Sequence, residues 1–285
     1  MTSTRTLPDV LANEGIADLT GLWPTETVQG WNDKLDPMFA AIDAEARSYV
    51  GADQLVNTGI FAELFSDPVR RLIAGIQPSA LLYHCHCYEI AAGQDKSHIH
   101  AGKLQGWHKD WDTVQYFTPD YPSYLSLFVL LSPVAGDDGP FEFQPQSASE
   151  GLRASAQIVQ LVGPVGTAAI WNRSYFHRAA PNRGNVRRRI LKISIQPAGL
   201  PNDRIGLKEF RDAFANLDDP QLRALVDERR VGTTTPLPDG GDPVEARLFP
   251  SSKTNDLGPT AIAYGRIQSI SRRLQSLAGV GVITE

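Results

Sequence analysis

The spacing of hydrophobic residues changes twice along this chain and divides it into three regions. In residues 1–76 apolar residues recur three and four positions apart, which places them on one side of an α-helix. The clearest series is Val28, Trp31, Leu35, Phe39 and Ile42. A second stripe follows the helix-start signal Asp67-Pro68. We therefore expect this first region to be mostly helical.

The second region, residues 80–197, is a series of short runs with strand character. Alternating, β-branched and aromatic residues form the runs, and Gly, Pro, Asn and Asp cluster between them. The runs cover residues 80–90, 124–131, 141–143, 158–162, 167–171 and 190–195. Several short strands at this spacing are typical of a β-sandwich or barrel. We expect this region to be the core of the protein.

The third region, residues 203–285, returns to helical spacing. Its apolar stripe consists of Phe210, Phe214, Leu217, Leu222, Leu225 and Val226. A loop rich in Gly and Pro follows at residues 232–243, and residues 260–278 form a candidate last helix. Because a helix with an apolar stripe must bury it, we expect this extension to pack on the β core and to help cover the mouth of its pocket. The chain, residues 1–285, would then be one domain.

Charge and cysteine usage narrow the class of protein. The formal net charge is −5, with acidic and basic residues mixed, so no basic stripe indicates nucleic-acid binding. No apolar run approaches the roughly 18 residues of a membrane helix, and residues 1–6 lack the apolar core of a signal peptide. Cys85 and Cys87 are too close in sequence for an ordinary disulfide. These features favour a reduced, cytoplasmic protein, and they leave the oligomeric state open.

The residues with the clearest chemical meaning are His108, Asp110 and His177. His108 and Asp110 are two positions apart, so they point to one face if they end a strand. His177 follows the next predicted strands and can supply a second imidazole. Two imidazoles and one carboxylate form the facial triad that holds non-haem Fe(II) and leaves other coordination positions open. Asp112 is a rival for Asp110, because it lies on the same side of a strand.

Two other histidine pairs offer competing metal sites. His98 and His100 half-resemble a cupin metal motif, but Gln105 stands where that motif needs a glutamate. His84 and His86 alternate with the two cysteines, but structural zinc sites use a wider cysteine spacing. For the second pair we favour a strand with one face in the core and the other lining the pocket.

A candidate anion-binding arginine lies in the run Arg187-Arg188-Arg189. By alternation Arg188 shares a face with Ile190 and Lys192, whereas its two neighbours share the opposite face with Leu191. A guanidinium group can clamp a carboxylate through two parallel hydrogen bonds. Because a one-residue shift in the strand register would exchange the two faces, Arg187 stays possible as the anion-binding arginine. We expect the two neighbours of the binding arginine to be surface or edge charges.

From about residue 11 to about residue 197 the chain resembles the phytanoyl-CoA dioxygenase family of Fe(II)/2-oxoglutarate oxygenases. The segments that carry the resemblance are residues 15–19, residues 21–26, residues 139–145 and residues 177–182, followed by Arg188. One departure is Ala179, where the family often has a small hydroxyl residue. The resemblance implies a double-stranded β-helix, or jelly roll: a mainly β fold with flanking helices.

The resemblance also implies the activity and the cofactors. Fe(II) would be held by His108, Asp110 and His177, and 2-oxoglutarate would bind the metal while Arg188 pairs with its far carboxylate. With O2 the enzyme would oxidise a small molecule or natural product, by default through hydroxylation, and release succinate and CO2. Two alternatives stay open at this point: a cupin-type oxygenase that uses His98 and His100, and a jelly-roll protein that binds a ligand without turnover.

Overall fold

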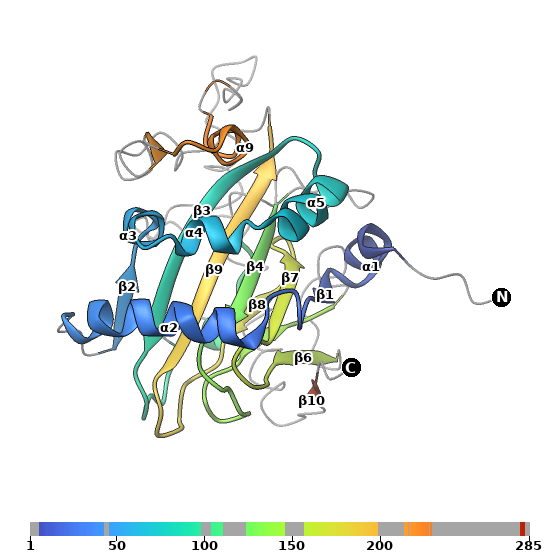
Figure 1. Ribbon diagram of the computed structural model, residues 1–285. Helices are drawn as coiled ribbons and strands as arrows, with labels where there is room; N and C mark the ends of the chain where they lie inside the picture. Colours follow the sequence, from blue (N-terminus) through green and yellow to red (C-terminus); the bar gives the residue numbers. More distant parts are fainter. Residues whose placement is uncertain are drawn as a thin grey trace, which may run out of the picture.

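Two β-sheets pack face to face, and a layer of helices covers the outer face of the larger sheet (Figure 1). The computed structural model describes residues 6–42, 46–97, 104–110, 124–145, 157–198, 214–215, 217–227, 229 and 280–282, although not the side chains of Tyr83 and His84. This arrangement is a jelly roll with flanking helices, so the fold class predicted from the sequence is confirmed.

The larger sheet has six strands in the order β1-β7-β4-β9-β3-β2, and all neighbouring pairs are antiparallel. Its strands are β1 (Ile16–Asp18), β2 (Arg47–Val50), β3 (Ala80–Ile90), β4 (Leu125–Leu130), β7 (Ala168–Asn172) and β9 (Arg188–Pro197). The smaller sheet has the order β10-β6-β5-β8. Its strands are β5 (Phe141–Phe143), β6 (Ile158–Leu161), β8 (His177–Ala179) and β10 (Val280–Val282).

Helices precede most of the strands. They are α1 (Leu7–Glu14), α2 (Thr25–Ala40), α3 (Ala52–Asn57), α4 (Ile60–Leu64), α5 (Asp67–Ile76) and α9 (Pro220–Ala224), with a 3₁₀ turn, η1 (Leu104–Gly106). Figure 1 shows α2, α4 and α5 lying across the face of the larger sheet. None of the helices in the described ranges combines the length and the apolar composition that crossing a bilayer requires.

The larger sheet separates two hydrophobic cores. One core lies under the helices and includes Leu191 and Ile193 of β9. The other lies between the sheets and includes Ile190 of β9 with Phe141 of β5 and Trp171 of β7. Successive residues of β9 therefore alternate between the two cores, as the sequence pattern predicts. One face of every central strand is thus available to line the space between the sheets.

An irregularity in β3 sets which of its residues face that space. The pairing with β9 shifts between Leu82 and His84, so one residue is added to the strand. As a result Leu82, Cys85 and Cys87 all face the helical core. Both cysteines are buried and free, and burial raises the pKa of each thiol. One face of this strand therefore lies in the core, as expected, and it is the face that carries the two cysteines.

The structure corrects the sequence prediction at four short strands. β1 and β2 interrupt the region predicted as helical, and β8 and β10 were not predicted. Strands of three or four residues are too short to show a period, and they form here through their pairing with neighbouring strands. The turn into β1 requires Gly15, which has φ 78° and whose added Cβ would lie 2.6 Å from the Tyr175 ring.

The described residues between 214 and 227 of the C-terminal extension pack on the helical layer, whereas residues 280–282 form β10 beside β6 in the smaller sheet. Phe214 and Leu222 are buried in the helical core, and the centre of the Phe214 ring lies 4.7 Å from the centre of the Phe61 ring. The Leu82 amide donates to the Leu225 carbonyl at 2.6 Å. Phe214 and Leu222 therefore lie on the helical side of the larger sheet and not over the space between the sheets, and the expectation that the extension helps to cover the pocket mouth stays a prediction. The predicted helix at residues 260–278 lies outside the described residues, and the single-domain organisation stays a prediction.

We expect Phe214→Ala to lower the free energy of unfolding by about 3–5 kcal/mol, the usual cost of removing a buried phenylalanine ring. Urea unfolding would measure it, with the exposed Asp218→Ala as a control that leaves stability unchanged. An unchanged midpoint in Phe214→Ala would show that the extension is not part of the folded core.

Candidate metal centre

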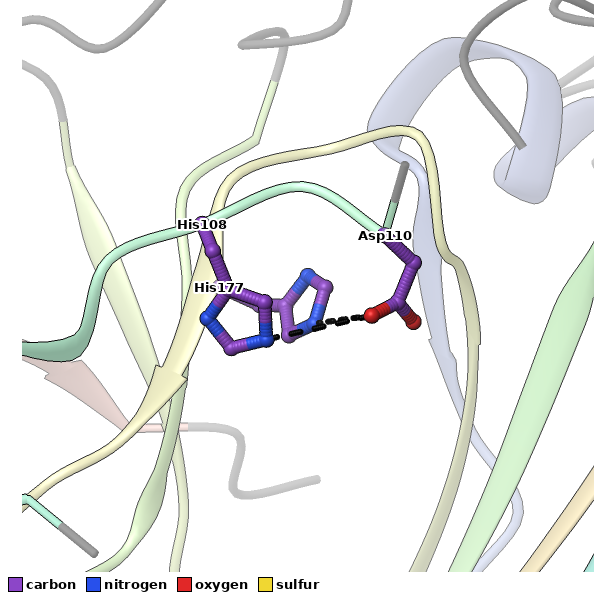
Figure 2. Close-up of side chains that lie close together, drawn as sticks. All are labelled: His108, Asp110 and His177. Carbon is purple, nitrogen blue, oxygen red and sulfur yellow. Dashed lines mark ion pairs between the residues drawn. The ribbon is translucent and has the colours of Figure 1, made fainter. Parts of the chain in front are cut away.

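The main chain brings His108 and His177 side by side. The His108 amide donates to the His177 carbonyl at 3.0 Å, and the His177 amide donates to the His108 carbonyl at 2.9 Å. The Asp110 amide continues the contact by donating to the Arg173 carbonyl at 3.3 Å. One ligand atom from each of His108, Asp110 and His177 lies within 4.8 Å of the other two. The three residues that the sequence singled out as metal ligands therefore come together, as Figure 2 shows.

Both imidazole rings are fixed in the same way. Nδ1 of His108 lies 2.7 Å from the Gly106 carbonyl oxygen, and Nδ1 of His177 lies 2.9 Å from that of Tyr175. A carbonyl oxygen only accepts, so each Nδ1 donates and each Nε2 keeps its lone pair. The two Nε2 atoms each lie 3.8 Å from Oδ1 of Asp110, along the dashed contacts in Figure 2. The lone pairs and the carboxylate oxygen thus surround one point.

Arg173 holds the Asp110 carboxylate in position. Its Nε donates to Oδ2 of Asp110 at 2.6 Å, which leaves Oδ1 directed to the imidazoles. Burial alone would raise the pKa of Asp110, but the positive charge of Arg173 and the other groups around it outweigh burial and hold this pKa well below its usual value. Asp110 is therefore an ionised carboxylate whose Oδ2 bonds to Arg173 and whose Oδ1 faces the two imidazoles.

His177 is a neutral imidazole in an aromatic setting. Its ring centre lies 4.3 Å from that of Trp171 and 5.8 Å from that of Phe141. Burial, and then the neighbouring His108 ring, lower the pKa of His177 well below its usual value. Neutral imidazoles are the form that binds metals. Because bonds from a divalent ion to such ligands are about 2.0–2.2 Å long, ligand atoms 3.8 Å apart can share one ion.

Three consecutive arginines, one just before β9 and two on it, have different environments. Arg188 is 1% exposed and faces the space between the sheets, whereas the Arg187 side chain is 49% exposed. Arg189 faces the helices and pairs with Glu89 at 2.6 Å and with Asp36 at 2.7 Å. The expectation of two surface or edge charges is therefore wrong for Arg189, because acidic partners cover it.

The competing histidines contribute nothing to the cluster in the described part of the chain. His98, His100 and Asp112 lie outside it, as does the side chain of His84. His86 packs with aromatic rings, 5.5 Å from Tyr49 and 5.6 Å from Tyr88.

Two arginines near the centre were not found from the sequence. Arg173 lies in the turn between β7 and β8, where no pattern marks it. Arg178 directly follows His177 on β8; its Nε donates to Glu142, and its Nη1 donates to the Gln105 carbonyl at 3.1 Å. Arg178 thereby braces the segment that leads to His108. Alternation along β8 indicates only that Arg178 points away from the metal ligand.

Comparisons with known proteins agree with this architecture. The family model described as phytanoyl-CoA dioxygenase matches residues 14–190. No curated protein matches. The chain is similar to HygX from Streptomyces hygroscopicus, solved with nickel and 2-oxoglutarate bound, with 14% identity, a TM-score of 0.51, and 69% of this chain and 88% of that chain covered. It is also similar to AviO1 from Streptomyces viridochromogenes Tue57, with 13% identity, a TM-score of 0.50, and coverage of 68% and 96%. At these identities the likeness concerns the fold.

We expect Arg173→Lys to weaken divalent metal binding about 10- to 100-fold, the usual effect of losing a partner that orients a ligand. Lysine keeps the charge but cannot reproduce the Nε–H bond that fixes Asp110. Anaerobic calorimetric titration with Fe(II) or Co(II) would measure the affinity. Arg183→Lys, at an exposed position, is the matched control and should bind like the wild type. Equal affinities in the two variants would contradict the role given to Arg173.

Proposed function

The chain belongs to the phytanoyl-CoA dioxygenase family, and we propose that it is an Fe(II)- and 2-oxoglutarate-dependent oxygenase acting on a small molecule. The observation that carries the proposal is the donor set of the metal centre. Two imidazoles with lone pairs on Nε2 and one anchored carboxylate converge on one point. This is the ligand set of non-haem iron oxygenases, which leaves positions for a co-substrate and for oxygen. His108, Asp110 and His177 are the proposed ligands.

With iron, 2-oxoglutarate and O2 bound, such a centre supplies the oxidising power, placing one oxygen atom in succinate, releasing CO2 and leaving the other oxygen atom for the substrate. The protein's part is to position the ligands and to exclude water. The carbonyls of Gly106 and Tyr175 fix the rings, and Arg173 fixes the carboxylate. Because Arg173 engages Oδ2 of Asp110, Oδ1 is the oxygen that faces the two imidazoles.

Arg188 is the proposed partner of the far carboxylate of 2-oxoglutarate. Its three guanidinium nitrogens are buried and have no hydrogen-bond partner, and no carboxylate of the described chain pairs with it. A buried charge without a partner costs several kcal/mol, so an anion from outside the chain is expected there. Arg188 shares its face of β9 with Ile190 of the inter-sheet core, where Trp171 and Phe141 contact His177. Arg188 and the metal centre therefore face the same space.

We expect His177→Ala to bind Fe(II) far more weakly than the wild type, because two ligands cannot replace a three-point site. Anaerobic Fe(II) titration would measure the loss, and circular dichroism would check that the variant folds. In the wild type, incubation with Fe(II), 2-oxoglutarate and O2 should yield succinate, even slowly and without the natural substrate.

Two outcomes would redirect this interpretation. Unchanged iron binding in His177→Ala, with binding lost in His98→Ala, would favour a cupin-type site. Tight binding of iron and 2-oxoglutarate without any succinate formation, in the presence of a broad panel of small molecules, would favour a binding protein.

We expect Arg188→Lys to weaken 2-oxoglutarate binding by about 2 kcal/mol or more, the scale of a charge-assisted hydrogen bond. Lysine cannot offer the two parallel N–H groups of a guanidinium. Arg187→Lys, on the exposed neighbour, should have little effect and is the matched control. The anaerobic charge-transfer absorption of the Fe(II) complex would give both affinities. A larger effect in Arg187→Lys would show that the exposed arginine, and not the buried one, carries the site.

A further inference from the structure

A second arginine lies in the same row of the larger sheet as Arg188. Arg47 of β2 pairs with Ile90 of β3, and Ile90 pairs on its other side with Arg188 of β9. Residues directly opposite each other on neighbouring strands point to the same face. Arg47 and Arg188 therefore flank Ile90 and point to the same side of the sheet, the side that faces the smaller sheet. The two positions are two strand spacings apart, about 10 Å between backbones.

The Arg47 guanidinium turns toward the aromatic rings of the two outer strands. Its carbon lies 4.2 Å from the centre of the Tyr49 ring and 4.8 Å from that of the Tyr88 ring. In the ranges that the structure describes, Arg47 makes no ion pair and no side-chain hydrogen bond, and its Nε is fully buried. The rings attract its charge but accept none of its in-plane N–H groups. Arg47 thus has donors to offer.

The two guanidinium groups act on each other and on Tyr88. Burial, followed by the charge of Arg188, lowers the pKa of Arg47, although Tyr88 opposes this. Burial raises the pKa of Tyr88, while both arginines lower it. Like charges that are buried near one another are costly unless an anion lies with them. No acidic side chain of the described residues fills that role.

We propose that Arg47 and Arg188 together bind the far carboxylate of 2-oxoglutarate, with the Tyr88 ring beside it. A carboxylate has about four lone-pair sites and can accept from two guanidinium groups at once. Arg188 lies at the buried end, and Tyr49, 45% exposed, marks the outer end beside Arg47. The assignment rests on the proposed function and adds a binding residue from an edge strand. It makes the second carboxylate of the co-substrate a main source of its affinity.

The test compares two 2-oxo acids of equal length. 2-Oxopentanoate carries a methyl group where 2-oxoglutarate carries its far carboxylate, and both can chelate Fe(II) through the 2-oxo acid end. Anaerobic charge-transfer absorption of the Fe(II) protein would give the affinity of each acid for the wild type, Arg47→Gln and Arg47→Lys. Arg187→Gln, an exposed charge near the same end of the sheet, is the matched control.

We expect Arg47→Gln to weaken 2-oxoglutarate binding at least about tenfold, the scale of one charge-assisted hydrogen bond. The same variant should bind 2-oxopentanoate like the wild type, and Arg187→Gln should change neither affinity. Arg47→Lys, which keeps the charge and the stem, should fall between the wild type and Arg47→Gln. In the metal-free protein, the rise in melting temperature on adding glutarate should shrink in Arg47→Gln.

The contrary outcomes are separable. If Arg47→Gln and Arg47→Lys bind 2-oxoglutarate like the wild type while Arg188→Lys does not, the role of Arg47 is refuted and the proposed function stands. Equal weakening of both acids in the Arg47 variants would mean that Arg47 only supports the fold, which also refutes its role. If the wild type binds neither acid, the proposed function itself fails.

Discussion

The pair of backbone hydrogen bonds between His108 and His177 is the contact on which the centre depends. It joins the segment after η1 to β8, so the main chain itself places two imidazoles from distant parts of the sequence next to each other. Each ring is then oriented locally, because each Nδ1 bonds to the carbonyl two residues earlier, at Gly106 and at Tyr175. The geometry of two ligands is thus set by backbone groups, which side-chain substitutions elsewhere disturb least. Only Asp110 relies on another side chain, Arg173, for its orientation.

Charge is distributed unevenly around this contact. Arg173 neutralises Asp110, and Arg178 neutralises Glu142 behind β8, so the groups that position the ligands are balanced within the chain. Arg189 is likewise matched by Glu89 on the helical side. Among the arginines of β9, Arg188 differs, because no carboxylate in the described part of the chain pairs with it. A folded protein keeps buried charge unmatched only where function uses it, since the cost of that charge lowers an already small stability.

Residue alternation was enough to predict much of this arrangement. It placed Arg188 with Ile190 and away from Leu191, and it placed one face of β3 in the core, because long strands buried on two sides display their period. It failed for β1, β2, β8 and β10, which are too short to have a period and exist through their pairing partners. It also failed for Arg173, because a residue in a turn has no periodic neighbours, and its role follows only from the position of Asp110 in space. The inserted residue of β3 could not be predicted from the sequence either, because a bulge is defined by the pairing register with β9 and not by the strand itself.

The contact between Gly15 and Tyr175 links the N-terminal segment to the position of His177. The Gly15 carbonyl accepts from Asn172, and the Tyr175 ring occupies the space that a side chain at residue 15 would need. The carbonyl of the same tyrosine orients His177. Detaching β1 from β7 and releasing the histidine ring are therefore steps of one local opening, with one free energy. An ion held at His177 would lower the population of that opened state by mass action, and it would thereby protect an N-terminal segment that it does not touch.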